Sequence, residues 1–354
     1  MIERFEFGKI DGEAVDGFVL RNRNGFIAKV ITYGARLTEF HMPGRDGKLA
    51  DIVLGFDDLE SYIATNTYFG ATCGRYGNRI KNGQFELDGK AYQVDCNEGP
   101  NHLHGGRHGF DRKNWSALAD EKQNAVVFTV VSLDAEQGFP GTAQLSATYR
   151  LDDDNVLDIR MRGLTDKPTI LNAVHHSYWN LAGQGSGDVR NQSMKLYSDF
   201  YTPNDAELIT TGEVLAVAGT AFDFRAAKAI GADIDKLRDV GTGDLVGGGY
   251  DHNWCLKGAG GGLHPCARAV DPASGRGFEL QTNEPGVQFY TGGYLDKMVI
   301  GKRGLPYCRF AGYTFETQKF PNAPNFAHFP LSAIRPNEVY DHRMEFRFFN
   351  GEEP

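Results

Sequence analysis

The sequence predicts an all-β protein, a large antiparallel sandwich or barrel with few short helices. Turn signals are frequent along the 354 residues, 44 of which are glycine. Between the turns lie short runs rich in β-branched and aromatic residues, whereas patterns with helical periodicity are rare. No composition shift and no Ser/Pro-rich linker divides the chain, so we expect one large β domain over residues 1–354.

The strongest turn signals predict two hairpins near the N-terminus. Each consists of two strand-like runs on either side of an Asn-Gly or Asp-Gly pair, which supplies the positive φ angles of a tight hairpin loop. The runs are 18–20 and 26–33 around Asn24-Gly25, and 85–87 and 91–94 around Asp88-Gly89.

Further strands follow from runs of the same composition. In one of them Leu145, Ala147 and Tyr149 alternate with polar residues, the pattern of a strand buried on one face. The predicted strands are 37–42, 126–131, 144–151, 156–161, 277–282, 287–291, 313–318 and 344–349. Helical periodicity predicts only two short helices, over residues 56–64 and 225–237.

Charge and composition argue against several classes of protein. A net charge of −9 and the absence of a basic run argue against nucleic acid, whose binding needs a basic face. The first ten residues lack the apolar core of a signal peptide, and no apolar run is long enough to span a bilayer. The five cysteines are scattered without a CxxC pair, so neither a zinc ribbon nor a disulfide framework is expected. We therefore expect a soluble, cytoplasmic protein.

The stretch LNAVHHSYWNL at 171–181 is the first candidate site. Neighbouring side chains of a strand point to opposite faces, so His175 and His176 should face opposite ways. An imidazole beside a hydroxyl, aromatic rings and an amide suits a sugar-binding wall with a proton donor. The alternative is a half-buried strand whose histidines are merely hydrogen-bonded.

Four further polar clusters stand out, and each has a structural alternative. Metal ligands could come from His102, His104 and His108, because imidazole is a common ligand. No cysteine or carboxylate pair accompanies them, so no metal site is expected. Arg79 is equally explained as a salt-bridge partner, Asp251 as a turn cap, and Glu316 as an exposed strand residue. The clusters are RYGNRI at 75–80, NHLHGG at 101–106, GGGYDHN at 247–253 and FETQ at 315–318.

Three common motifs of enzymes are missing from the sequence. It has neither a GxGxxG nor a GxxxxGK[ST] phosphate loop, so nucleotide chemistry is unsupported. It also lacks the GxSxG elbow of serine hydrolases.

Together, these clusters and their flanking segments resemble the aldose 1-epimerase family, the galactose mutarotases. The segments occur in the family's order, from about Asn78 to near the C-terminus. They are RYGNRI, NHLHGG with GFDRKNW, HHSYWNLAGQGSG, YTPNDAELITTGEV with AGTAFDF, GYDHNW, GVQFYTGGYLD and FETQKFPNAPN. The resemblance implies a single large β-sandwich of the galactose mutarotase type (a supersandwich), an open sugar cleft and no cofactor.

The resemblance also implies roles for particular residues. His176, rather than His175, matches the family's general acid, Glu316 matches its general base, and His104 lies near the anomeric end of the sugar. The residues expected to bind sugar hydroxyls are Asn78, Arg79, Asp251 and Gln288.

The implied reaction interconverts the α and β anomers of free aldoses such as galactose and glucose. Ring opening needs a proton delivered to the ring oxygen and one removed from the C1 hydroxyl, which an acid and a base can do together. From ordinary pKa values, His176 should be partly protonated and Glu316 ionised near pH 7.

Three alternative functions remain at this point. A non-catalytic sugar-binding or sugar-sensing module would keep Arg79 and Asp251 but need no acid–base pair. A glycoside hydrolase or lyase would also use two opposed acid–base groups, but hydrolysis canonically uses two carboxylates rather than histidine with glutamate. A hexose 6-phosphate epimerase would need a cationic pocket, for which the motifs supply no extra Lys/Arg cluster. The expected partner is a free monosaccharide, and the protein is expected to be a monomer or homodimer.

Overall fold

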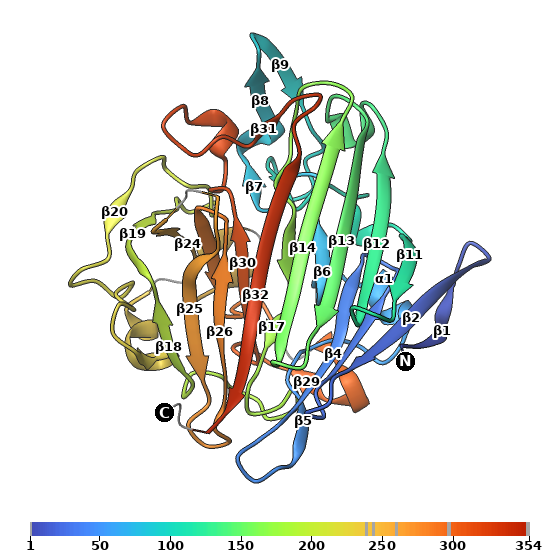
Figure 1. The fold of residues 1–354 in the computed structure, drawn as a ribbon. Helices are drawn as coiled ribbons and strands as arrows, with labels where there is room; N and C mark the ends of the chain where they lie inside the picture. The colour runs from blue at the N-terminus through green and yellow to red at the C-terminus, as the bar shows by residue number, and fades with distance from the viewer. Residues whose placement is uncertain (1, 238–239, 243–244, 259–260, 296–298, 352–354) are drawn as a thin grey trace.

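The computed structural model describes residues 2–237, 240–242, 245–258, 261–295 and 299–351 (Figure 1). Asp296, which ends the GVQFYTGGYLD segment, lies outside these residues. The described chain is dominated by antiparallel strands, which form three large sheets and several two-stranded ones. Within the described residues, no helix combines the length and the apolar character needed to cross a membrane.

The largest sheet has nine strands, and the C-terminal strand β32 lies in its middle (Figure 1). β32 pairs with β14 on one side and β26 on the other, so it joins a meander from the middle of the chain to strands from the last third. In spatial order the strands are β11 (Ser116–Asp120), β12 (Ala125–Ser132), β13 (Ala143–Leu151), β14 (Val156–Thr165), β32 (Tyr340–Asn350), β26 (Arg276–Thr282), β25 (His264–Val270), β18 (Ser193–Leu196) and β21 (Lys228–Ala229).

Two smaller sheets pack on the same face of this sheet. The six-stranded sheet contains, in order, β17 (Tyr178–Trp179), β30 (Tyr313–Gln318), β27 (Gly286–Tyr290), β24 (Asp251–Leu256), β19 (Ser198–Thr202) and β20 (Leu215–Ala216). The five-stranded sheet contains β1 (Glu3–Ile10), β2 (Glu13–Arg21), β3 (Ile27–Ile31), β4 (Arg36–Pro43) and β5 (Leu49–Asp51).

Aromatic side chains fill the space between the layers. Phe278 of β26 packs edge-on against Phe315 of β30, with ring centroids 6.0 Å apart. Phe348 of β32 stacks on Phe40 of β4 at 4.2 Å. These contacts belong to one continuous hydrophobic cluster that draws residues from all three sheets, so the fold is the expected antiparallel β-sandwich.

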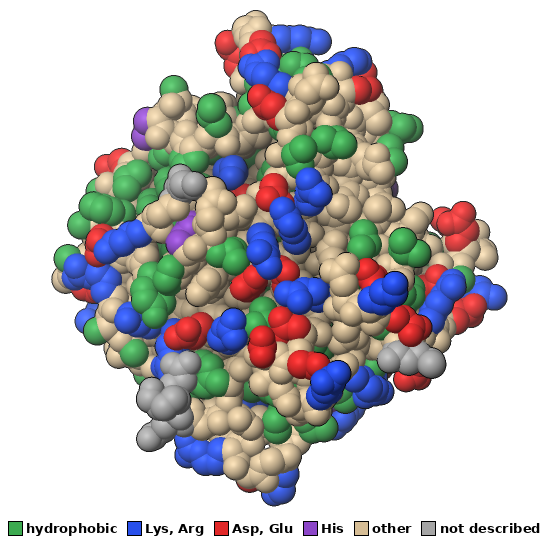
Figure 2. Space-filling model, in the orientation of Figure 1, with side chains coloured by type: hydrophobic (Ala, Val, Ile, Leu, Met, Phe, Trp, Pro, Cys, Tyr) green, Lys and Arg blue, Asp and Glu red, His purple; other side chains and the backbone are tan. Residues whose placement is uncertain are grey.

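The opposite face of the nine-stranded sheet is charged. Arg160 pairs with Asp341 at 2.7 Å, and Arg343 pairs with Asp158 at 2.9 Å. Figure 2 shows acidic and basic side chains intermixed over this view of the molecule. One face of the sheet is thus apolar and the other solvated, the usual arrangement of an antiparallel layer.

Most sequence predictions of strands are confirmed, including both hairpins. Asp88 and Gly89 have φ angles of 55° and 75°, as the loop between β8 (Gln84–Leu87) and β9 (Lys90–Gln93) requires. Some strands were missed: none of the residues of β1 is buried and its apolar residues are few, and β25 contains Pro265 at a register shift.

The two helix predictions have different outcomes. The first is confirmed as α1 (Leu59–Ala64), which begins later than predicted because Asp58 caps it by accepting from the Ser61 amide. The second is wrong: residues 225–237 form β21 and a 3-10 segment, η4 (Ile230–Lys236). The amides of Ile230 and Gly231 donate to the carbonyls of Gln192 and Arg190, so tertiary pairing overrides the local helical pattern.

Candidate active site

The face of β30 that points away from the core carries Glu316. On this strand Phe315 packs into the core against Phe289, so the neighbouring Glu316 must face the other way. Gln288 of β27 lies directly opposite Glu316, and Asn253 of β24 lies opposite Gln288. Three adjacent strands therefore present a row of polar side chains on the outer face of the six-stranded sheet.

His176 meets Glu316 from a separate strand. β16 (Val174–His176) pairs with β6 (Ala71–Cys73) and lies close to β30. The His176 Nε2 atom lies 3.4 Å from the Glu316 Oε1 atom. Both side chains are buried, at 4% and 2% exposure, so the alternative of an exposed Glu316 is wrong.

The adjacent histidines face opposite ways, as alternation predicts. His175 contacts the core, where its ring nitrogens lie 3.2 Å from the Tyr149 hydroxyl and 2.7 Å from the Ser177 hydroxyl. His176 instead packs against Tyr178 and the His104 ring. His175 thus has a structural environment, and of the two adjacent histidines His176 is the one that contacts Glu316.

His104 is the third member of the cluster. Its Nδ1 atom accepts a hydrogen bond from the Asn78 amide at 3.1 Å, so the neutral ring carries its proton on Nε2. That Nε2 atom lies 3.9 Å from the Glu316 Oε2 atom. The next residue, Gly105, has φ +96°, and a Cβ there would lie 1.7 Å from the Gly74 carbonyl oxygen, so the loop requires glycine.

The other two histidines of this region lie elsewhere. His102 is buried, and both its ring nitrogens are engaged by the backbone of Asp95 and Gly105. His108 is exposed. The loop therefore does not bring its own three histidines together.

A second polar group surrounds Arg79. The Arg79 guanidinium makes two hydrogen bonds to Glu98, at 2.6 and 2.7 Å, and its Nη1 atom lies 3.8 Å from Asp251 Oδ2. Gln288 Nε2 donates to Asp251 Oδ1 at 2.6 Å. Asn78 is buried, and its side-chain oxygen accepts from the Arg79 amide at 2.8 Å. Arg79 is therefore a salt-bridge partner, which was the alternative explanation from the sequence. It also lies beside the other residues predicted to bind the sugar.

Sequence reasoning missed two contributors to these groups. The Tyr68 ring lies 4.7 Å from that of His104 and 5.6 Å from that of His176, on a left-handed backbone with φ 57°. Glu98 holds Arg79 but comes from a loop without a strong pattern. Tyr68 lies just before β6 and belongs to no periodic run of residues. Neither Tyr68 nor Glu98 therefore had a sequence signal that would have identified it.

Burial changes the protonation expected from ordinary pKa values. Desolvation raises the pKa of Glu316 to about 8, with a further rise from the Asp251 charge. Desolvation lowers the pKa of His176 to about 3 and that of His104 well below its usual range. The expectation of an ionised Glu316 beside a protonated His176 near pH 7 is therefore wrong for the unliganded site, because a buried site disfavours both charges.

Two buried polar atoms of the pair are unsatisfied within the part of the chain that the structure describes. Glu316 Oε2 and His176 Nδ1 are buried and have no hydrogen-bond partner among the described residues. Glu316 Oε1 accepts from the Thr314 hydroxyl at 3.2 Å. A donor from a bound molecule would satisfy the second carboxylate oxygen.

The same cluster could also hold a metal ion. One ligand atom from each of His104, His176 and Glu316 lies within 4.8 Å of the others. Two imidazoles and a carboxylate are a donor set that zinc accepts. The expectation that the protein needs no metal stays a prediction.

Comparisons with known proteins agree with this architecture. A family profile described as aldose 1-epimerase matches residues 16–347. The human galactose mutarotase is 40% identical over 349 residues, covering 98% of each chain. The Haemophilus influenzae aldose 1-epimerase is 37% identical over 327 residues, covering 92% of each.

Solved structures share the fold at similar length. An aldose epimerase homologue from C. elegans superposes with a TM-score of 0.87 at 30% identity, covering 96% of this chain and 100% of the other. A galactose 1-epimerase from Lactobacillus acidophilus gives 0.83 at 27% identity, covering 99% of each chain. On the family match and on relatives of this identity and coverage, the chain belongs to the aldose 1-epimerase family.

Proposed function

We propose that the protein is a mutarotase, which interconverts the α and β anomers of free aldoses such as galactose and glucose. The observation that carries the proposal is the 3.4 Å contact between His176 Nε2 and Glu316 Oε1 in a buried polar site. Membership of the family and the names of its relatives support the same reaction.

In the proposed mechanism, His176 is the general acid and Glu316 the general base. Glu316 takes the proton of the C1 hydroxyl while His176 gives its proton to the ring oxygen, and the bond between C1 and that oxygen breaks. Rotation about C1–C2 presents the other face of the aldehyde. The roles then reverse as the ring closes, so no proton is gained or lost overall.

Substrate binding would shift the pair toward this protonation state. The C1 hydroxyl can donate to Glu316 Oε2, which has no other partner among the described residues. A hydrogen bond to the charged form of a carboxyl lowers its pKa, so the proton moves toward His176. His104 Nε2, 3.9 Å from the same oxygen, would support that charge.

We further propose that Asn78, Arg79, Asp251 and Gln288 hold the non-reacting hydroxyls. Asp251 lies within reach of both Arg79 and Gln288, so its carboxylate is oriented before a sugar arrives. Fixing these hydroxyls leaves C1 as the part of the sugar that turns.

Polarimetry of freshly dissolved α-D-galactose and α-D-glucose tests the proposal. The wild-type protein should accelerate relaxation to the anomeric equilibrium, and Glu316→Gln and His176→Asn should each lower kcat by roughly 10²–10⁴-fold. Circular dichroism and thermal melting of both variants control for folding.

Two results would contradict the assignment. Near-wild-type activity in either variant would refute the role of that residue. Failure to accelerate mutarotation of any free hexose or pentose, alongside measurable sugar binding, would favour the non-catalytic binding module instead.

We also propose a cytoplasmic location and a monomer or homodimer. All five cysteines are free, as is usual in a reducing compartment. Cell fractionation tests the location, and light scattering after gel filtration tests the assembly.

A further inference from the structure

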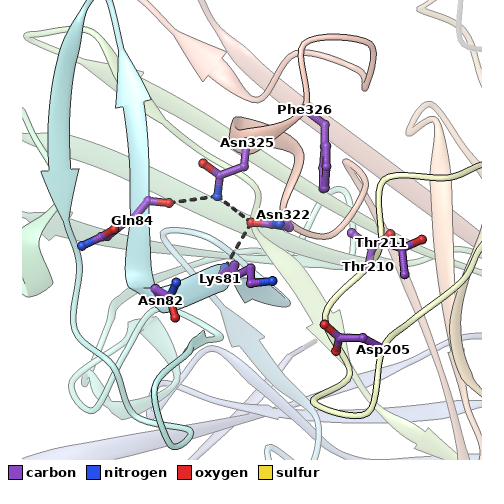
Figure 3. Close-up of a pocket in the computed structure, with 9 residues that line it drawn as sticks. All are labelled: Lys81, Asn82, Gln84, Asp205, Thr210, Thr211, Asn322, Asn325 and Phe326. Carbon is purple, nitrogen blue, oxygen red and sulfur yellow. Dashed lines mark hydrogen bonds between the residues drawn. The ribbon is translucent and has the colours of Figure 1, made fainter.

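A groove with a cavity volume of about 580 Å³ is lined by none of the predicted site residues (Figure 3). Three segments wall it: residues 81–84, 205–211 and 322–326. Segments 81–84 and 205–211 adjoin the sugar site. Lys81 follows Arg79 by two positions, and Asn204, next to the second segment, donates to the Asp251 carbonyl at 2.8 Å. The volume falls within the roughly 300–1,000 Å³ typical of small-molecule sites.

Two of the three walls, segments 81–84 and 322–326, are tied to each other by side-chain amides. Asn322 Oδ1 accepts from the Lys81 amide at 3.1 Å and from Asn325 Nδ2 at 2.7 Å, as Figure 3 shows. Asn325 Nδ2 also donates to the Gln84 carbonyl at 2.9 Å. These bonds fix segments 81–84 and 322–326 relative to each other, which reduces the ordering cost of binding on that side of the groove.

The lining has the chemistry of a site for a neutral, hydroxyl-rich molecule. Lys81 and Asp205 contribute one charge of each sign, so the groove has no excess cation for a phosphate. The side-chain amide of Asn82 can both donate and accept, which suits hydroxyl groups. Phe326 is the single aromatic side chain in the lining and offers an apolar surface to the C–H face of a sugar ring.

One hydroxyl group in the lining has no hydrogen-bond partner in the described part of the chain, and a ligand could supply one. Thr210 is 2% exposed, and its Oγ1 atom has no hydrogen-bond partner among the described residues. Buried hydroxyls are normally paired. A hydroxyl of a molecule in the groove would satisfy it.

We propose that this groove is a second saccharide-binding site, which takes a neutral saccharide independently of the His176–Glu316 pair. The site shares no residue with the pair, so a ligand there needs no free anomeric hydroxyl. Saccharide binding in the groove goes beyond the proposed mutarotase activity. A substitution that abolishes either the binding or the activity should leave the other intact.

Non-reducing saccharides test this proposal, because they cannot undergo mutarotation. Sucrose, trehalose and raffinose would each be titrated into the ¹⁵N-labelled protein, with the backbone amide shifts followed by NMR. At least one should shift the amides of residues 81–84 and 205–211. Thr210→Val and Lys81→Met should weaken that binding at least about fivefold, as expected for the loss of one hydrogen bond.

Thr202→Val is the matched control. Thr202 is also fully buried with an unpartnered Oγ1 atom, but it does not line the groove. Its isosteric replacement should leave saccharide binding unchanged. Shifts confined to residues around Glu316, no shifts with any of the three saccharides, or equal weakening by Thr202→Val would each overturn the proposal.

Discussion

At the scale of single residues, the position of one proton decides what the candidate active site can do. With the pKa of His176 lowered to about 3 and that of Glu316 raised to about 8, the pair holds one proton between these values. The two groups are close enough to titrate as a unit. The pair therefore always has one group ready to give a proton and one ready to take it over this range.

This arrangement predicts a broad pH plateau of activity. The value of kcat/KM should stay nearly constant between about pH 3 and about pH 8, as far as the protein remains folded. Above about pH 8 it should fall about tenfold per pH unit, because Glu316 loses the only proton of the pair. Polarimetry across pH 5–10 measures the profile, and a rise in kcat/KM above pH 8 would contradict it.

The raised pKa of Glu316 also predicts a change in stability. The unfolded chain releases this proton near pH 4.5 and the folded chain near pH 8, so the wild-type protein loses stability as the pH rises through this window. Glu316→Gln removes the buried charge and should raise the melting temperature relative to wild type, more at pH 9 than at pH 5. An equal difference at both pH values would be inconsistent with a protonated carboxyl in the folded protein.

At the scale of elements, strand alternation and tight turns present the site residues. β30 turns Phe315 into the core and Glu316 out of it, and β16 does the same with His175 and His176. His104 is held by a turn in which Gly105 approaches the Gly74 carbonyl too closely for any side chain. Each catalytic candidate is thus oriented by backbone geometry.

A buried ion pair joins two other elements and gives a test of stability. Lys302, 4% exposed in η5 (Lys302–Gly304), pairs with Asp51 of β5 at 2.6 Å and donates to the Val53 carbonyl at 3.0 Å. Lys302→Met leaves the Asp51 carboxylate buried and unpaired, and should lower the free energy of unfolding by about 3–5 kcal/mol. Urea denaturation measures the loss.

The control for Lys302→Met is Lys48→Met. Lys48 pairs with Asp46 at 3.4 Å on the exposed surface, where the pair contributes little. A similar small effect of both substitutions would show that the Lys302 pair does not stabilise the attachment of β5.

At the scale of the whole molecule, β32 completes the core. It lies in the middle of the nine-stranded sheet although it is the last strand of the chain. Phe348 contacts both Phe40 and Trp179, so the C-terminal strand connects the nine-stranded sheet to the layers that cover it. We propose that residues 1–354 fold as one cooperative domain for this reason.

Substitutions in β32 test this view. Phe348→Ala should lower the free energy of unfolding by about 3–5 kcal/mol, because it empties a packed core position. Phe349→Ala is the matched control, since Phe349 is half-buried on the other face of the same strand. Both variants should unfold in one transition, followed by circular dichroism and tryptophan fluorescence, and two separate transitions would contradict a single cooperative domain.

The sequence by itself determined the all-β class, both hairpins, most strands and the opposite orientation of His175 and His176. These features depend on local rules of turn chemistry and alternation, which act between residues close in the chain. The resemblance to the aldose 1-epimerase family assigned roles to residues that no local pattern connects.

Only the tertiary structure decided the rest. His104, His176 and Glu316 come from distant segments, and their distances depend on how the sheets pack. Tyr68 and Glu98 joined the candidate site through contacts that leave no local pattern. Residues 225–237 lost their helix to pairing with β18, and burial reversed the expected protonation of Glu316. Packing and desolvation depend on the whole fold, so no short segment can encode them.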